Sequence, residues 1–204
     1  RPRFHDLCGF SEAELRTALE AVGAACGLDA ASIQTALDLM RDFYNGYRFS
    51  PQREERVYNP TLALYFLKRL AEDGVYPDRL LDDNLAMDRN RIQYVARLPH
   101  GEALVNAALN PVEPLAVAQL SNRFGVQDML TAPRDPTFLA SLLYYFGVLT
   151  LGGRDELGAL ILTIPNQVIR KLYVERLQEQ VLPAYDDQEQ RQTICRRFYA
   201  TGEI

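Results

Sequence analysis

The sequence predicts a mainly helical protein of the α+β class, in which a helical bundle is followed by a helix, a β-hairpin and a further helix. Three observations lead to this expectation. Apolar residues recur at helical spacing behind capping residues along most of the chain. A stretch near residues 148–164 instead alternates and contains β-branched residues, which favours strands. The 204 residues are 48% hydrophobic and 24% charged, as is typical of a globular protein with a buried core.

Capping residues predict two helices near the start of the chain. Ser11 is a good N-cap, and Glu14 three residues later completes a capping box, so a helix should begin there and stop near Gly27. Either Asp29 or Ser32 caps a second helix, because both side chains can accept from the first free N–H groups. That helix should end at residues 45–46, where glycine relieves the left-handed strain of a helix C-terminus.

A third helix is expected to begin at Asn59 and Pro60. Asparagine caps it, proline occupies the first turn, where its missing N–H costs nothing, and Gly74 closes it. Weaker patterns predict helices at residues 86–97 and 102–109. The prolines of residues 111–114 suggest an internal boundary, which would divide the chain into a helical region, residues 1–110, and a connecting region, residues 111–204.

The last third of the chain has the clearest alternation between element types. Residues 115–120 fit either a strand or the start of a helix. Residues 136–146 predict an apolar helix that ends at glycine, followed by a short strand at 148–151, a turn at 152–155 and a return strand at 159–164. Asn166 then caps a long final helix. Helix, hairpin and helix follow in this order in the second half of a winged-helix domain, and also in unrelated folds.

The lysine content excludes two catalytic centres. Lys68 and Lys171 are the only lysines. Neither follows a glycine-rich loop or precedes Ser or Thr, so neither can serve a phosphate-binding P-loop. A PD-(D/E)XK nuclease centre needs a carboxylate two residues before its lysine, and those positions hold Phe66 and Ile169. The chain is therefore not expected to be an enzyme by itself.

Other catalytic and metal-binding patterns are also missing from the sequence. No CxxC pair occurs, and His5 with Cys8 is the only close pair of His and Cys residues, without a second pair of ligands nearby. His100, between proline and glycine, is expected in an exposed turn. The acidic pairs at residues 82–83 and 186–187 have the character of loop or cap residues. We therefore expect no metal or cofactor in this chain.

Charge and cysteine usage point to a cytoplasmic protein that does not cross a membrane. Three widely spaced cysteines do not suggest a disulfide framework, and no apolar run reaches about 18 residues. A net charge of -5 argues against a dedicated nucleic-acid binder, although a local basic face stays open. The residues that could form such a face are Arg154, Arg170, Lys171 and Arg176.

Two clusters of aromatic and polar residues stand out, at residues 43–49 and 57–60. The first combines a helix end, a glycine turn and packing aromatics, and the second is the capped start of a helix. A short polar loop joins them. In the simplest interpretation the aromatic residues lock a corner between two helices.

These clusters resemble motifs of a known family, the bacterial AAA-ATPase-like proteins, many of which end in a PD-(D/E)XK nuclease-like domain. Five segments of the chain are similar to segments of that family and occur in the same order. They are residues 9–14, 44–49, 57–60, 141–150 and 162–168. Each similarity is weak alone, but together they cover most of the chain outside residues 76–133.

The resemblance implies that this chain is the helical lid and connecting region of a longer protein. A P-loop core that binds ATP and Mg²⁺ would precede Arg1, and the nuclease-like domain would follow Ile204. The motif residues would then face the nucleotide of the core: Tyr44, Asn45, Gly46, Tyr47, Arg48, Tyr58, Asn59 and Pro60. Arg48 could meet phosphate charge, or it could form a structural ion pair at the corner.

Three functions follow from these patterns. The first is a regulatory lid that couples nucleotide state to a neighbouring domain. The second is a protein-interaction module, which exposure of Tyr44, Tyr47 or Phe49 would support. The third is a nucleic-acid-binding winged helix, which requires the four basic residues to gather on one face. Arg170 and Arg176 are six residues apart and do not share a helical face, so the third has the least support.

Overall fold

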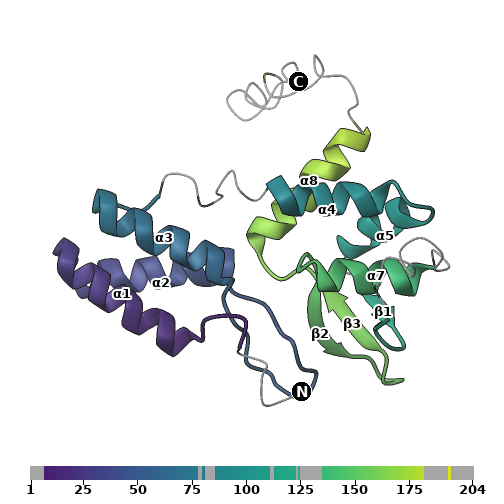
Figure 1. Cartoon of the computed structure of the whole chain (residues 1–204), viewed down its shortest axis with the longest axis horizontal. Helices are drawn as coiled ribbons and strands as arrows, with labels where there is room; N and C mark the ends of the chain where they lie inside the picture. The colour runs from purple at the N-terminus through teal and green to yellow at the C-terminus, as the bar shows by residue number, and fades with distance from the viewer. Residues whose placement is uncertain are drawn as a thin grey trace, which may run out of the picture.

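The computed structural model describes residues 7–77, 80, 86–110, 113–122, 124, 135–181 and 193. They form two units that lie side by side, one of three helices and one of four helices around a three-stranded antiparallel sheet (Figure 1). The elements are α1 (Glu12–Cys26), α2 (Ala30–Tyr44), α3 (Pro60–Asp73), α4 (Ala86–Ala96), α5 (Gly101–Ala108), β1 (Leu115–Val117), α7 (Pro136–Tyr145), β2 (Thr150–Arg154), β3 (Leu160–Thr163) and α8 (Gln167–Val181). The predicted mainly helical α+β class is confirmed.

The predicted caps hold α1 and α2 in place. The Ser11 hydroxyl accepts from the Glu14 N–H, and the Glu14 carboxylate accepts in return from the Ser11 N–H, so the capping box is complete. Gly27 ends α1 in the left-handed conformation, with φ 70°. Of the two candidates for the next cap, Asp29 is the residue used, and its carboxylate accepts from the Ser32 N–H at 2.8 Å.

The end of α2 differs from the prediction. Asn45 leaves the helix in an extended conformation, with φ -77° and ψ 175°, so glycine does not form the left-handed cap. Gly46 is needed for another reason. Its φ is 118°, and a Cβ atom there would lie 1.8 Å from the carbonyl oxygen of Pro165. Only glycine permits this close approach of two backbone segments.

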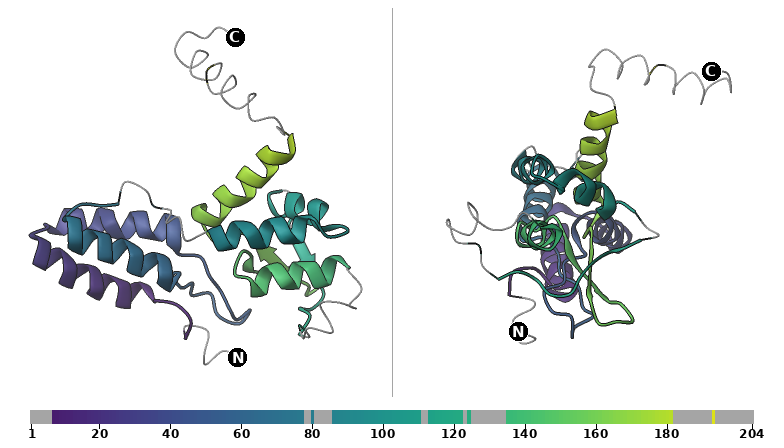
Figure 2. Two further views of the ribbon diagram at one scale, coloured as in Figure 1. Left: turned by 45° about the horizontal axis from the view of Figure 1, so that its top comes forward. Right: turned by 90° about the vertical axis from the view of Figure 1, so that its right-hand side faces the viewer.

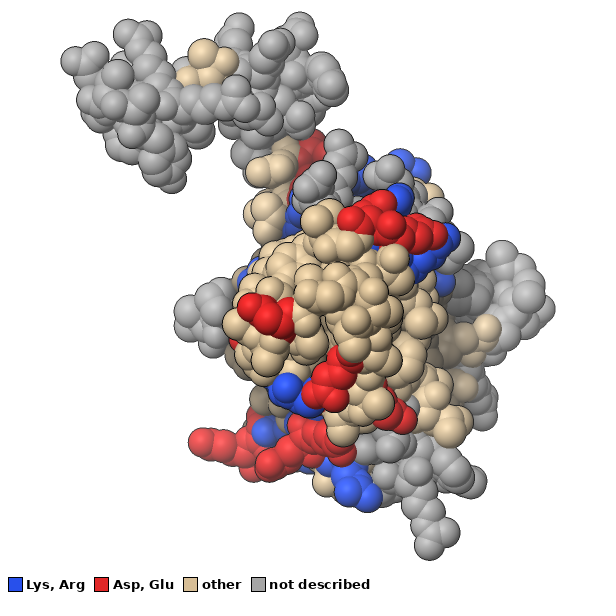
Figure 3. Space-filling model, turned by 90° about the vertical axis from the view of Figure 1, so that its left-hand side faces the viewer, with Lys and Arg blue, Asp and Glu red and all other residues tan. Residues whose placement is uncertain are grey.

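The first unit packs α1, α2 and α3 around its own core. As predicted, α3 begins behind Asn59 and ends at Gly74, which has φ 68°. The apolar faces of the three helices supply the core residues, among them Leu15, Leu19, Leu37, Met40, Tyr44, Leu62, Phe66 and Leu70. The end of this unit away from the sheet, where α1 and α3 finish and α2 begins, is mainly uncharged, with acidic and basic side chains towards its edges (Figure 3).

The second unit is built around α7 and the sheet. The strand order is β1-β3-β2, and both pairs are antiparallel. Residues 115–117 form a strand, which settles the ambiguity left by the sequence. Helices α4, α5, α7 and α8 contribute to the core together with the sheet. Its most buried members include Ile92, Val95, Val105, Leu139, Leu143, Val148, Ile169 and Tyr173.

The predicted hairpin is present, but its turn lies later than expected. β2 begins at Thr150 and runs to Arg154, so residues 152–154 belong to the strand and not to the turn. A bulge between Leu151 and Gly153 accommodates this glycine pair. The turn occupies residues 155–158, where the Asp155 carboxylate accepts from the N–H groups of Leu157 and Ala159. The apparent turn signal of the two glycines thus marks a bulge.

The two cores do not divide where the sequence suggested a boundary. Ile92 and Leu104 lie before residue 110 and yet pack into the second core. The division between the cores therefore falls ahead of α4, and it does not coincide with the expected regions 1–110 and 111–204. At the start of α8 the cores meet, because Val168 packs into the first and Ile169 into the second.

The final helix begins as predicted. The Asn166 side-chain oxygen accepts from the Ile169 N–H at 3.1 Å and caps α8. From there α8 runs away from the three-helix unit across α4 (Figure 2). None of the helices in the described ranges, α8 included, is long and apolar enough to cross a membrane.

Candidate functional site

Five segments that lie far apart in the sequence meet between the two units. They are residues 8–10, 44–49, 57–60, 144–151 and 165–168, and we call this place the motif junction. Phe10 and Tyr58 exchange backbone hydrogen bonds of 3.2 and 2.8 Å, and Tyr47 and Val57 exchange bonds of 3.2 and 2.9 Å. These two bridges hold the first three segments together. The short loop that leads out from Tyr47 and returns to Val57 forms the base of the junction.

The fourth segment is attached to the second through Thr150. Its buried hydroxyl accepts from the Arg48 N–H at 2.7 Å and donates to the Arg48 carbonyl at 3.1 Å. The Leu151 N–H also reaches the Arg48 carbonyl, at 3.4 Å. The fifth segment contacts the second through Gly46, which lies against Pro165. Through these contacts the loop of the first unit is bonded to the sheet and the α8 start of the second.

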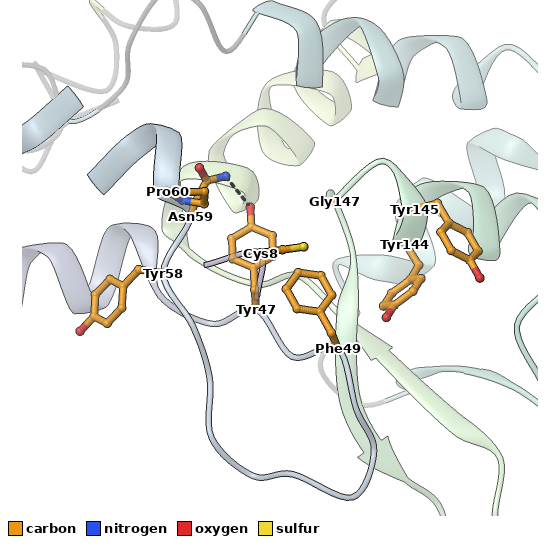
Figure 4. Close-up of a pocket in the computed structure, with 9 residues that line it drawn as sticks. All are labelled: Cys8, Tyr47, Phe49, Tyr58, Asn59, Pro60, Tyr144, Tyr145 and Gly147. Carbon is orange, nitrogen blue, oxygen red and sulfur yellow. Dashed lines mark hydrogen bonds between the residues drawn. The ribbon is translucent and has the colours of Figure 1, made fainter. Parts of the chain in front are cut away.

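A pocket of about 270 Å³ opens at the motif junction (Figure 4). It is lined by Cys8, Tyr47, Phe49, Tyr58, Asn59, Pro60, Tyr144, Tyr145 and Gly147. The Tyr47 and Phe49 rings stack with centroids 6.3 Å apart, while the Tyr144 and Tyr145 rings meet edge to face at 5.3 Å. Tyr145 is 53% exposed. No lining residue is charged, so the pocket suits an uncharged group.

The side chain of Asn59 links the pocket to the start of α3. Its oxygen accepts from the Thr61 and Leu62 N–H groups, and its amide nitrogen donates to the Tyr47 hydroxyl at 3.5 Å. Tyr47 is only 6% exposed. Burial raises the pKa of Tyr47 above its ordinary value, and the bond from Asn59 partly opposes that rise. Both residues therefore act mainly as fixed, neutral walls of the pocket.

Arg48 does not point its charge at an open site. Its guanidinium donates to the backbone carbonyls of Ser50 at 3.1 Å, Pro51 at 2.8 Å and Gly152 at 3.5 Å. The expected structural role is present, but its partners are carbonyl oxygens and not the carboxylate of an ion pair. Arg48 fastens the loop to β2, and each of its three guanidinium nitrogens already donates to a carbonyl oxygen.

Tyr44 and Tyr58 are buried, with their hydroxyl groups turned to the first unit. Tyr44 donates to the Leu80 carbonyl at 2.9 Å, and burial raises its pKa. Tyr58 donates to the Glu12 carboxylate at 3.2 Å. Burial, followed by the Glu12 charge, raises the pKa of Tyr58 to about 12. Exposure of Tyr44, Tyr47 or Phe49 would support an interaction module. Tyr44 and Tyr47 are buried and give no such support, and Phe49 is half-buried.

A pair on α4 that sequence reasoning missed connects this helix to the junction. Arg91 donates to the Asp88 carboxylate at 2.7 Å and to the Phe146 carbonyl at 3.0 Å. Its guanidinium also lies over the Phe146 ring, 5.5 Å from the centroid. Burial raises the pKa of Asp88, and the Arg91 charge opposes this. The three-residue spacing of Asp88 and Arg91 on one helical face can be seen in the sequence. Their contact with Phe146, at the C-cap of α7, cannot.

The four candidate nucleic-acid residues do not gather on one face. Arg154 is at the end of β2 and donates to the Gly158 carbonyl, whereas Arg170, Lys171 and Arg176 lie on α8, on the other side of the second unit (Figure 1). Lys171 and Arg176 pair with Glu175 and Glu179, at 3.9 and 3.3 Å. α7, the helix before the hairpin, is mostly buried and carries no charge. These contacts do not form the basic face that the winged-helix hypothesis requires.

The remaining chemical candidates are dispersed. Cys8 is exposed and lines the pocket, and the Cys26 thiol donates to the Leu70 carbonyl at 3.4 Å. His100 is exposed, as predicted, at a turn with φ 64°. In the described part of the chain no group of three or more His, Cys, Asp or Glu residues is placed to hold a metal. His5, Cys195 and the acidic pairs 82–83 and 186–187 lie outside the described residues.

Comparison with known proteins adds no relative. No family model, no curated protein and no solved structure matches this chain. The function has therefore to be argued from the geometry of the motif junction.

Proposed function

We propose that this chain is a non-catalytic lid or connecting segment of an AAA-ATPase-like protein, which couples a nucleotide-binding core to a following domain. The observation that carries the proposal is the convergence at one junction of the five segments that resemble the motifs of that family. Segments 144–151 and 165–168 contact segment 44–49 across the boundary between the two cores, and segments 8–10 and 57–60 are joined to it within the first unit. Displacement of one unit would therefore displace the other, because closely packed segments move together.

The pocket provides the contact through which a neighbouring domain would act. Its lining is aromatic and uncharged, so it favours an apolar or aromatic side chain and not a phosphate group. In this proposal ATP and Mg²⁺ are held by the upstream P-loop core, and Arg48 stiffens the lid instead of sensing phosphate. The partners are that core and a downstream nuclease-like domain of the same chain, in the cytoplasm.

Calorimetry on two proteins tests the proposal: this chain, and the same chain extended upstream by the expected core. The extended chain should bind ATP much more tightly than this chain alone, because the expected core would supply the P-loop. Tyr145→Ser in the extended chain should then change ATP affinity by roughly fivefold or more, the lower range of site coupling. Tyr94→Ser is a matched control, because Tyr94 is 45% exposed on α4 and does not line the pocket.

Two results would reject the proposal. One is ATP binding by the chain alone that is as tight as ATP binding by the extended chain, which would make an upstream core unnecessary for the nucleotide site. The other is an equal effect of Tyr145→Ser and Tyr94→Ser on ATP affinity, which would remove the pocket from the coupling.

A second candidate is a protein-interaction module that docks an unrelated partner. The observation that favours it is the same exposed Tyr145 at an aromatic pocket. The two candidates differ in their dependence on nucleotide: a simple docking module would bind its partner equally with and without ATP.

A further inference from the structure

Buried polar atoms without hydrogen-bond partners occur on α8 and α5, two helices that contact each other. Among the described residues, these atoms are the Tyr173 hydroxyl, Arg176 Nε and Gln180 Nε2 on α8, and Asn106 Oδ1 on α5. The three α8 residues are three and four positions apart and so share one helical face. A buried polar atom that has no partner costs about 1–3 kcal/mol, and native proteins contain few.

An open basin of about 800 Å³ lies between the end of α4, the α4–α5 corner, α5 and α8, and two of these four residues, Asn106 and Arg176, line it. Arg97, His100, Asn106 and Arg176 line it, together with one acidic residue, Glu102. Arg97 is exposed and pairs with no carboxylate within the described ranges. Arg176 is more buried, with 21% of its side chain exposed, and donates from Nη1 to Glu179. Its Nε–H is left for another acceptor.

The corner that carries Arg97 and His100 is sterically fixed. His100 has φ 64°, which is uncommon for a residue other than glycine. Gly101 follows it, and a Cβ atom on Gly101 would lie 1.8 Å from the Val95 carbonyl oxygen. The backbones of α4 and α5 therefore touch, and the basin has a preformed wall.

We infer that this basin binds a phosphoryl group, with Arg97 and Arg176 as its principal ligands. The planar guanidinium groups match phosphate oxygens, and their charge survives at any physiological pH. The site shares no residue with the motif junction, so it does not depend on the function proposed above.

The phosphoryl group could belong to a small molecule or to a nucleic-acid backbone. Calorimetry of the whole chain at low salt, with pyrophosphate and separately with a short oligothymidine, distinguishes them. Binding of pyrophosphate alone indicates a small-molecule site. Tighter binding of the oligonucleotide, with a steep salt dependence, indicates a backbone site. Either result supports the inference.

Variants make the test specific to the basin. Arg97→Gln removes an exposed charge without disturbing a core, and should weaken binding by about tenfold or more, the typical effect of losing one charge-assisted bond. Arg53→Gln, in the exposed loop of the first unit, is the matched control and should bind as the original chain does. No saturable binding of either probe, or the same loss in both variants, would overturn the inference.

Discussion

The motif junction and the α4–α5–α8 basin are both meeting places of several elements, but they differ in how their polar atoms are satisfied. At the junction the side chains of Arg48, Thr150 and Asn59 form hydrogen bonds with neighbouring backbone groups. Among the described residues there, Asn166 Nδ2 is the one buried polar side-chain atom without a partner. Two such atoms, Arg176 Nε and Asn106 Oδ1, belong to residues that line the basin. Buried polar atoms that have hydrogen-bond partners are typical of a structural contact, whereas buried polar atoms without partners are typical of a site that binds a ligand.

The difference also separates the roles of the arginines. For Arg48 the sequence left open a phosphate contact or a structural ion pair, and in the structure each of its guanidinium nitrogens donates to a carbonyl group. Arg97 and Arg176 retain the free N–H groups that a phosphate requires. An arginine can bind a ligand through the N–H groups that have no partner in the protein, and the sequence does not reveal which these are.

Gly46→Ala should have the largest effect on the stability of the motif junction. The new methyl group would overlap the Pro165 carbonyl at a residue with positive φ, so we expect a loss of roughly 3 kcal/mol in the free energy of unfolding. Gly27→Ala is the control, because Gly27 also has positive φ but no atom within 4 Å of a Cβ, and it should lose about 1 kcal/mol. Urea titration of both variants measures the difference, and equal losses would contradict a tight contact at Pro165.

Thr150→Val tests the bond between the loop and the sheet. The substitution keeps the side-chain shape but removes the acceptor for the Arg48 N–H, so unfolding free energy should fall by about 2 kcal/mol. Its cross-strand partner Thr163 is only half-buried, and Thr163→Val should stay within about 0.5 kcal/mol. If the two variants have the same stability, Thr150 does not carry the connection.

A pair of tyrosine substitutions compares satisfied and unsatisfied hydroxyl groups directly. Tyr44→Phe removes a bond to the Leu80 carbonyl and should cost about 1 kcal/mol. Tyr173→Phe removes a buried hydroxyl that has no partner, so the stability should be unchanged or higher. Thermal unfolding of the two variants gives the sign, and a clear loss from Tyr173→Phe would mean that its hydroxyl is bonded after all.

The smallest expected effect is the pH dependence contributed by Glu12. The hydrogen bond from Arg41, at 2.6 Å, is the main cause that holds the pKa of Glu12 below its ordinary value of 4.5. Because the pKa is depressed in the folded state, this stabilisation is present above about pH 4.5 and is lost as pH falls through the folded-state pKa. The pair is 40% and 41% exposed, so it contributes less than about 1 kcal/mol. Glu12→Gln should therefore be slightly less stable near neutral pH, and the difference should shrink as the pH falls and Glu12 becomes protonated in the folded chain; a constant difference would exclude the linkage.

Local signals predicted most of the fold, because caps and apolar spacing act within one helix. Ser11, Asn59 and Asn166 start their helices where expected. The errors arise where a distant segment decides the conformation. Gly46 appeared to be a helix cap, but it serves the contact with Pro165, more than a hundred residues away. The glycines at 152 and 153 appeared to form a turn, but pairing with β3 draws them into a strand.

The candidate site was only partly predictable. The motif residues Tyr47, Tyr58, Asn59 and Pro60 line the pocket, but the contribution of Tyr144 and Tyr145 depends on tertiary packing that no local pattern indicates. The basin was missed because Arg97 and Arg176 are 79 positions apart in sequence. Unsatisfied buried atoms can be recognised only when the neighbouring helices are in place.

The proposed coupling is tested most directly at Cys8, which is exposed and lines the pocket of the junction. With Cys26 and Cys195 replaced by serine, the rate of alkylation at Cys8 reports whether the pocket is open. The account predicts that alkylation slows by about tenfold when the upstream core is present, and that ATP changes this protection. An unchanged alkylation rate in the chain alone, in the extended chain and in the extended chain with ATP would contradict it.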